Sequence, residues 1–215
     1  MSNGVINKRL KFIAILLLLP VGVIVPALII DGHSSSQYHY VHAQNDPEFE
    51  ERKRNYRAQL TDDLISTEEE RIRQRCDAVR TNIRSLDNDV GVVKTERNAA
   101  YDAILEELND LMERLNAQAF ETSQLESNLD TLESKIDKFK SDMDDYIEVV
   151  NDLTNIDCRQ DQEAFQGALQ IARQYNGRLL PQNGDIRSYI VNTIKPTLEK
   201  VREDIEAGRT TGGGQ

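Results

Sequence analysis

The chain has 215 residues, a formal net charge of −11, no tryptophan and only 6% aromatic residues. Residues 1–45 carry three cations and one anion, so the rest of the chain holds a net charge of −13. Phosphate backbones and anionic headgroups repel such an acidic body, so we expect neither nucleic-acid binding nor flat contact with a membrane surface. Few aromatics and 29% charged residues favour one elongated helical unit over a compact globular core.

An apolar segment near the N-terminus predicts a membrane anchor. Residues 12–30 are nineteen consecutive residues without a charge, and Lys8, Arg9 and Lys11 precede them. As a helix the segment spans about 28 Å, close to the hydrocarbon thickness of a bilayer. The cations before it predict that residues 1–11 form a cytoplasmic tail and that the remainder lies outside the cytoplasm. We therefore expect a single-pass protein of the cell membrane.

A secretory signal peptide is the alternative interpretation of this segment. Val41-His42-Ala43 has small residues at the offsets of a cleavage site, which would make Gln44 the first residue of a secreted protein. The apolar run is longer than the usual signal core and ends thirteen residues before the cleavage position. We favour the retained anchor.

Residues 31–45 are rich in Ser, Gln and His, without hydrophobic periodicity, and predict a flexible linker. All three histidines of the chain lie here, His33, His39 and His42. No carboxylate or thiolate pattern fixes a coordination geometry around them, so we predict an ordinary polar linker and no metal site.

The folded part is expected to begin at Asp46-Pro47, with Asp as N-cap and Pro at the first helical position. Thr67 followed by Glu70 offers a second capping box, which allows a break near Ser66. Basic residues in the first helix alternate with Glu50 and Glu51, and we interpret them as a solvated face. These basic residues are Arg52, Lys53, Arg54 and Arg57.

A coiled-coil seam follows, because apolar residues recur in steps of four and three from Ile72 onward. Its positions are Cys76, Val79, Ile83, Leu86, Val90, Val93, Arg97, Ala100 and Ile104. The one charged member, Arg97, either sets the register with its head group in water or serves a binding role.

The pattern fails after Leu115 and restarts at Leu125, and Ser123 with Glu126 forms a capping box that predicts a new helix from Gln124. We therefore expect the chain to reverse within residues 116–122. Ala119 and Phe120 at this tip either cap the hairpin core or present a contact point for a partner.

The two cysteines support the same turn. Cys76 and Cys158 are 82 residues apart and centred on residue 117. In one continuous helix they would stand about 120 Å apart, whereas a hairpin turning at residues 116–122 brings them level on antiparallel helices. We predict a structural disulfide between Cys76 and Cys158, with free thiols or intermolecular bridges as the alternative.

Beyond Cys158 we expect a short helix containing Phe165 and Leu169, a break in the Gly- and Pro-containing stretch 176–184, and a last helix capped by Asp185. That helix is predicted to pack back on the base of the hairpin, kinked at Pro196, and to stop at Gly208. Residues 209–215 are expected to be a disordered tail.

The chain resembles a group of uncharacterised, exported or membrane-anchored helical coiled-coil proteins of reduced-genome, candidate-phylum bacteria. The resemblance covers residues 69–204 and is carried by Arg71-Ile72-Arg73-Gln74-Arg75-Cys76, Glu121-Thr122-Ser123-Gln124-Leu125, Ile156-Asp157-Cys158 and Asp185-Ile186-Arg187-Ser188-Tyr189. Turns in that group contain a Gly, and this chain has Ala119-Phe120 instead. The resemblance implies fold and location but no activity.

The folded part contains no histidine, no phosphate-binding glycine loop and no paired-cysteine motif. We therefore expect no enzyme activity, no cofactor and no small-molecule substrate. The expected fold is all-α: a transmembrane helix over 12–30, then an antiparallel helical hairpin or three-helix bundle over 46–208. The expected function is an envelope scaffold, spacer or adaptor that contacts a protein partner through its helical surface. The alternative is a ligand-sensing helical bundle that works with a membrane partner, through a cavity lined by Tyr175, Leu179 and Tyr189.

Overall fold

A computed structural model describes residues 46–60 and 66–208 of this protein. These residues form helices joined by short turns and contain no strand, so the predicted all-helical fold is confirmed for them. Within the same residues, no helix combines the length and apolar character that crossing a bilayer requires. The predicted membrane span at 12–30, its flanking segments 1–11 and 31–45, and the tail at 209–215 lie outside the described residues.

The first helix, α2 (Pro47–Ala58), begins as the sequence predicts. Asp46 is its N-cap and accepts a hydrogen bond of 3.0 Å from the Glu48 N–H, with Pro47 at the start of the helix. The next helix, α3 (Ser66–Ala117), begins at the expected second start.

Helix α4 (Ser123–Asn155) follows a turn in which Ala119 adopts a left-handed backbone conformation with φ 55°. The expected capping box is wrong: Thr122 is the N-cap, Ser123 already belongs to the helix, and neither side chain caps it. The Thr122 hydroxyl instead donates to Asn116 Oδ1 across the turn, at 2.5 Å. This link joins the two helix ends directly.

Helices α3 and α4 run antiparallel, because residues at equal distances from the turn face one another. Close to the middle, Lys140 of α4 pairs with Asp102 of α3. At the far end the structure pairs Cys76 with Cys158 as a disulfide, with Cα atoms 5.7 Å apart. The predicted proximity of the two cysteines is therefore confirmed.

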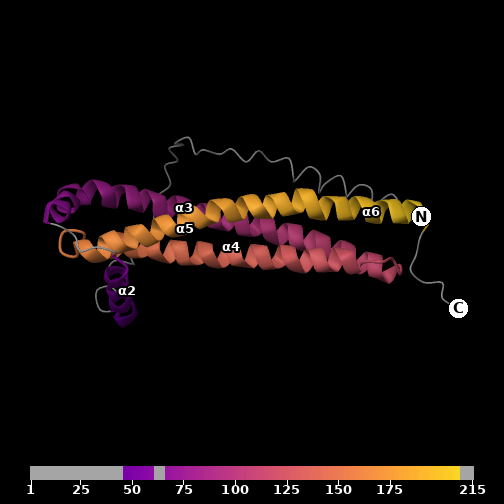
Figure 1. Ribbon diagram of the computed structural model, residues 1–215, viewed down its shortest axis with the longest axis horizontal. Helices are drawn as coiled ribbons and strands as arrows, with labels where there is room; N and C mark the ends of the chain where they lie inside the picture. The colour runs from indigo at the N-terminus through magenta and orange to yellow at the C-terminus, as the bar shows by residue number, and fades with distance from the viewer. Residues whose placement is uncertain (1–45, 61–65, 209–215) are drawn as a thin grey trace, which may run out of the picture. The chain divides into compact units, whose positions relative to one another are not determined.

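Helix α5 (Gln162–Tyr189) lies beside α4 along its length (Figure 1). The expected break at 176–184 is wrong, because α5 continues through Gly177 and through Pro181. Packing outweighs the local preferences there. Leu179 is buried, Gln182 donates to Asp142 of α4, and the Tyr101 hydroxyl of α3 donates to Asn183 at 2.6 Å.

A π-helix, η2 (Ile190–Ile194), joins α5 to α6 (Lys195–Glu206) where a kink at Pro196 was expected. The Lys195 N–H bonds to the carbonyl of Ile190, five residues back. Pro196 cannot donate, so an α-helix here would leave the Asn192 carbonyl without its partner. The wider turn accommodates the proline without ending the helix.

The predicted packing of the last helix on the base of the hairpin is wrong. Helix α6 lies beside the beginning of α4, next to the turn, where Asn128 donates to the Thr197 hydroxyl at 2.9 Å. The position at the base is taken by α2, which contacts α5. The long α5, uninterrupted at Pro181, carries the chain past the base and back toward the turn.

Candidate interaction surfaces

The residues singled out from sequence occupy the two ends of the hairpin. Cys76 and Cys158 are both buried at its base. At the opposite end Ala119 is exposed and Phe120 is half-buried. Phe120 N–H bonds to the Leu115 carbonyl, so the tip is an ordered helix end. The structure does not bring these two pairs together, and they form no common site.

Three of the four basic residues of α2 are paired with acids and only Arg54 is exposed, which corrects the sequence interpretation of a solvated face. Arg52 forms a two-pronged ion pair with Asp152 of α4, with Nε to Oδ2 at 2.7 Å and Nη2 to Oδ1 at 2.9 Å. Asp152 is buried and also accepts a 2.6 Å hydrogen bond from the Tyr56 hydroxyl. Arg57 pairs with Asp161, and Lys53 Nζ lies 3.7 Å from the same carboxylate.

These contacts set the ionisation of the group that we call the α2 clamp, formed by Arg52, Tyr56, Asp152, Arg57 and Asp161. Burial, together with the hydrogen bond to Asp152, raises the pKa of Tyr56. The hydrogen bond to Asp152 raises the pKa of Arg52 and outweighs desolvation, which lowers it. The clamp therefore holds charged guanidinium groups and a neutral phenol at neutral pH.

The clamp also depends on a glycine. A Cβ added at Gly167 would stand 2.1 Å from the Tyr56 carbonyl oxygen, so only glycine lets α2 approach α5 this closely. Phe49 and Tyr56 of α2 are both buried in this contact. Sequence reasoning missed the contact because the partners of α2 are about a hundred residues away along the chain.

A second surface is the flank of α3 that faces α5. The predicted seam is buried at Ile83 and Val90, but Leu86 is 40% exposed and Val93 is 39% exposed. Arg97 is exposed too, so this charged member of the seam keeps its head group in water. Contacts between α3 and α5 are sparse compared with those that each makes to α4.

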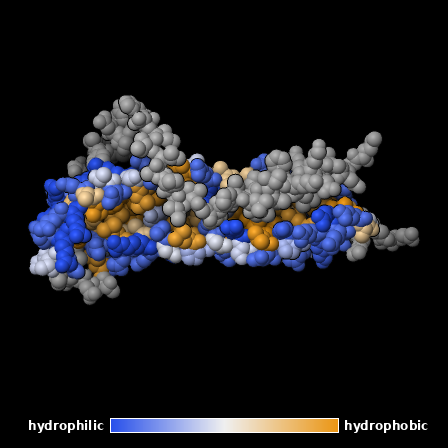
Figure 2. Space-filling view, turned by 90° about the horizontal axis from the view of Figure 1, so that it is seen from above, coloured by the Kyte–Doolittle hydropathy of each residue, from blue (hydrophilic) through white to orange (hydrophobic). Residues whose placement is uncertain are grey.

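Helix α5 contributes apolar side chains to the same side of the molecule, the half-buried Leu169 and Leu180, which is 70% exposed. We call the surface formed by Leu86, Val93, Leu169 and Leu180 the α3–α5 face. Figure 2, seen from above Figure 1, shows apolar side chains gathered in patches along the molecule, with a polar margin along the lower edge of the view. Such a row is typical of a surface that contacts another helix.

The three residues expected around a ligand cavity take part instead in contacts between helices. They are Tyr175, Leu179 and Tyr189. Leu179 is buried, and the Tyr175 hydroxyl donates to Asp145 of α4 at 3.2 Å. The Tyr189 ring lies 5.4 Å from Lys135 Nζ. Among residues 46–60 and 66–208, no group of three or more His, Cys, Asp or Glu side chains is placed to hold a metal ion.

No protein-family model, curated protein or solved structure matches this chain.

Proposed function

We propose that the chain is a single-pass membrane protein of the bacterial cell envelope whose helical unit acts outside the cytoplasm as a scaffold, spacer or adaptor. The observation that carries the proposal is the α2 clamp. Helix α2 is the first described element after the apolar segment 12–30, and it is fastened to α4 and α5 by ion pairs to Asp152 and Asp161. Such fastening holds in place the end of the helical unit that follows the predicted linker.

The cysteine pair supports an extracytoplasmic location. A Cys76–Cys158 disulfide persists in oxidising compartments and is rare in the cytosol. It closes the hairpin at its base, close to α2, where a tethered scaffold needs strength. The remaining contacts are those of a helical support: α3, α4 and α5 present long polar faces and bury narrow apolar seams.

Membrane extraction of the full chain tests this proposal. After expression in a bacterium, the protein should stay with the membranes through an alkaline carbonate wash and be released by detergent. Its intact mass should include residues 1–43. A soluble protein whose mass begins at Gln44 would support secretion after cleavage and contradict the anchor.

The ligand-sensing bundle remains the second candidate from sequence. It needs a cavity between α5 and the hairpin, whereas Tyr175, Leu179 and Tyr189 take part in the packing of α5 on α4. We therefore favour the scaffold.

A further inference from the structure

The α3–α5 face has polar margins of opposite sign. Asp89 and Glu107 are eighteen residues apart on α3, which is five full helical turns, so they lie on the same side of that helix. Both are exposed and project on the outer side of Leu86 and Val93. The margin on α5 carries Arg173 and Arg187, also exposed.

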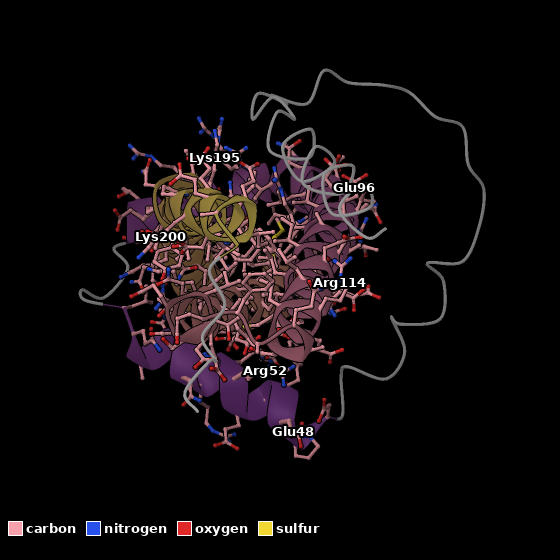
Figure 3. The ribbon with its side chains drawn as sticks, turned by 90° about the vertical axis from the view of Figure 1, so that its right-hand side faces the viewer. Glu48, Arg52, Glu96, Arg114, Lys195 and Lys200 are labelled. Atoms are coloured by element: carbon pink, nitrogen blue, oxygen red, sulfur yellow. A yellow bond between two sulfur atoms is a disulfide. The ribbon has the colours of Figure 1, made fainter. Side chains whose placement is uncertain are left out.

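These four charges have no partner among the described residues. Some other charged side chains of α3 and α5 are paired with α4, as Asp102 is with Lys140 and Asp185 with Lys135. Figure 3 shows Glu96 and Arg114 on the α3 side of the helical unit and Lys195 on α6. The surface is therefore acidic along its α3 edge, while on α5 the two arginines alternate with Leu180 along one stripe, and the exposed Arg97 lies between the two.

The hydrogen bond between Tyr101 and Asn183 fixes which residues of α3 and α5 lie at the same height, meaning the same position along the helix axes. Asp89 precedes Tyr101 by twelve residues and Arg173 precedes Asn183 by ten, so their heights differ by about 3 Å. Glu107 follows Tyr101 by six residues and Arg187 follows Asn183 by four, which gives the same small offset. Each acid on α3 thus has an arginine at its own height on α5.

Apolar side chains on the two helices match in height as well. Leu86 precedes Tyr101 by fifteen residues, and Leu169 precedes Asn183 by fourteen. Leu180 precedes Asn183 by three residues and the exposed Ala100 precedes Tyr101 by one, so their heights differ by only two residues. Because α3 and α5 are both antiparallel to α4, they run in the same direction.

We propose that the α3–α5 face is the interface of a parallel homodimer. A two-fold axis that runs parallel to the helices preserves height and places α3 of one copy against α5 of the other. It brings Asp89 to the partner's Arg173 and Glu107 to the partner's Arg187, each twice. Leu86 meets the partner's Leu169 just beyond the first of these pairs, and Arg97 is level with the partner's Leu180 between the two pairs. A second copy therefore pairs both acids of the α3 edge with arginines of α5.

This interface uses only side chains of α3 and α5, so it stands apart from the membrane anchor. It agrees with the anchor nonetheless, because both chains of a parallel dimer leave the helical unit in the same direction. An antiparallel dimer would direct its two N-termini oppositely, and the predicted linker 31–45 of one copy would have to span the length of the helical unit to reach the same membrane.

The test compares full-length chains, purified in mild detergent, by analytical ultracentrifugation over a range of concentrations. Leu180→Arg should raise the dimer dissociation constant about tenfold or more, since it places a second cation level with the partner's Arg97. The matched control is Thr95→Arg: Thr95 is exposed and lies nine residues, or two and a half helical turns, from Leu86, so it is on the opposite side of α3 from the α3–α5 face. It should leave the dissociation constant unchanged.

Charge exchange keeps the proposal testable if Leu180→Arg perturbs folding. Asp89→Arg and Arg173→Glu should each weaken the dimer about fivefold or more, and the double variant should recover to within about twofold of the original. A chain that stays monomeric at every concentration overturns the proposal. So does a dimer that neither Leu180→Arg nor the single charge reversals weaken, because its contact then lies elsewhere, for example in residues 12–30.

Discussion

Gly167 of α5 lies directly against the backbone carbonyl of Tyr56 of α2, and a Cβ at residue 167 would stand 2.1 Å from that oxygen. The contact places α2 where Arg52 and Tyr56 both reach Asp152. One missing side chain on α5 thus permits the ion pairs that fasten the beginning of the folded unit to its centre.

Gly167→Ala should release α2 from the other helices, because the clash is with backbone and cannot be relieved by a rotamer change. Limited proteolysis should then cleave within residues 47–58 much faster than in the original protein. The matched control is Gly177→Ala on the same helix, where nothing lies within 4 Å of the added Cβ. It should be neutral or stabilising by up to about 1 kcal/mol, since alanine favours helix over glycine. Equal protection of α2 in both variants would contradict the close approach.

Arg52→Ala should weaken the docking of α2 by about 2–4 kcal/mol, because it leaves the buried carboxylate of Asp152 without its charged partner. The loss should appear as faster hydrogen exchange of the α2 amides. Arg54→Ala is the control: Arg54 is exposed, and we expect a change within about 0.5 kcal/mol. Indistinguishable exchange in the two variants would show that the ion pair contributes little.

The raised pKa of Tyr56 predicts that the folded protein loses stability at alkaline pH. Burial and the hydrogen bond to Asp152 raise the pKa of Tyr56 above that of the unfolded chain, so the folded form retains the proton longer. The stabilisation from Tyr56 is complete below about pH 10 and is lost as the pH rises further, at about 1.4 kcal/mol per pH unit. Burial raises the pKa of Tyr101, Tyr146 and Tyr175 as well, so these residues add to the total slope. Urea unfolding between pH 8 and 11.5 should show this slope, and Tyr56→Phe should reduce it. An unchanged slope would mean that Tyr56 ionises as freely as in the unfolded chain.

Reduction of the cysteine pair should destabilise the hairpin without abolishing its helices. Cys76 and Cys158 enclose a loop of 82 residues, and closing a loop of this length stabilises by about 4–5 kcal/mol in the chain-entropy model. We expect the urea midpoint of the full chain to fall on addition of reductant, with the helical circular dichroism largely retained before unfolding. Non-reducing mass spectrometry should find no free thiol. Two free thiols in the protein purified without reductant would exclude the bridge.

The hairpin could be predicted from sequence because local signals and the cysteines agreed. The seam failed after Leu115 and restarted at Leu125, and the midpoint of Cys76 and Cys158 fell in the same interval. The structure ends α3 at Ala117 and begins α4 at Ser123. Cap chemistry was less reliable, since the Thr122 hydroxyl bonds across the turn to Asn116 and does not cap the helix.

The course of α5 and the docking of α2 depend on contacts that no local pattern encodes. Pro181 is a helix breaker by propensity, yet Gln182 and Asn183 bond to α4 and α3 and keep the segment helical. Arg52 is indistinguishable in sequence from a solvated arginine until the fold brings Asp152 to it. The α3–α5 face was likewise hidden, because Leu86 and Val93 occupy regular seam positions and only the spacing of α3 from α5 exposes them.

Labelling of intact bacteria with a membrane-impermeant maleimide tests the central claim, that an N-terminal anchor holds the helical unit outside the cytoplasm, most directly. With the native cysteines oxidised, a reporter introduced by Thr211→Cys should react in intact cells, whereas one introduced by Asn3→Cys should react only after the cells are permeabilised. A Thr211→Cys reporter that stays protected until permeabilisation would place the helical unit in the cytoplasm and contradict the account.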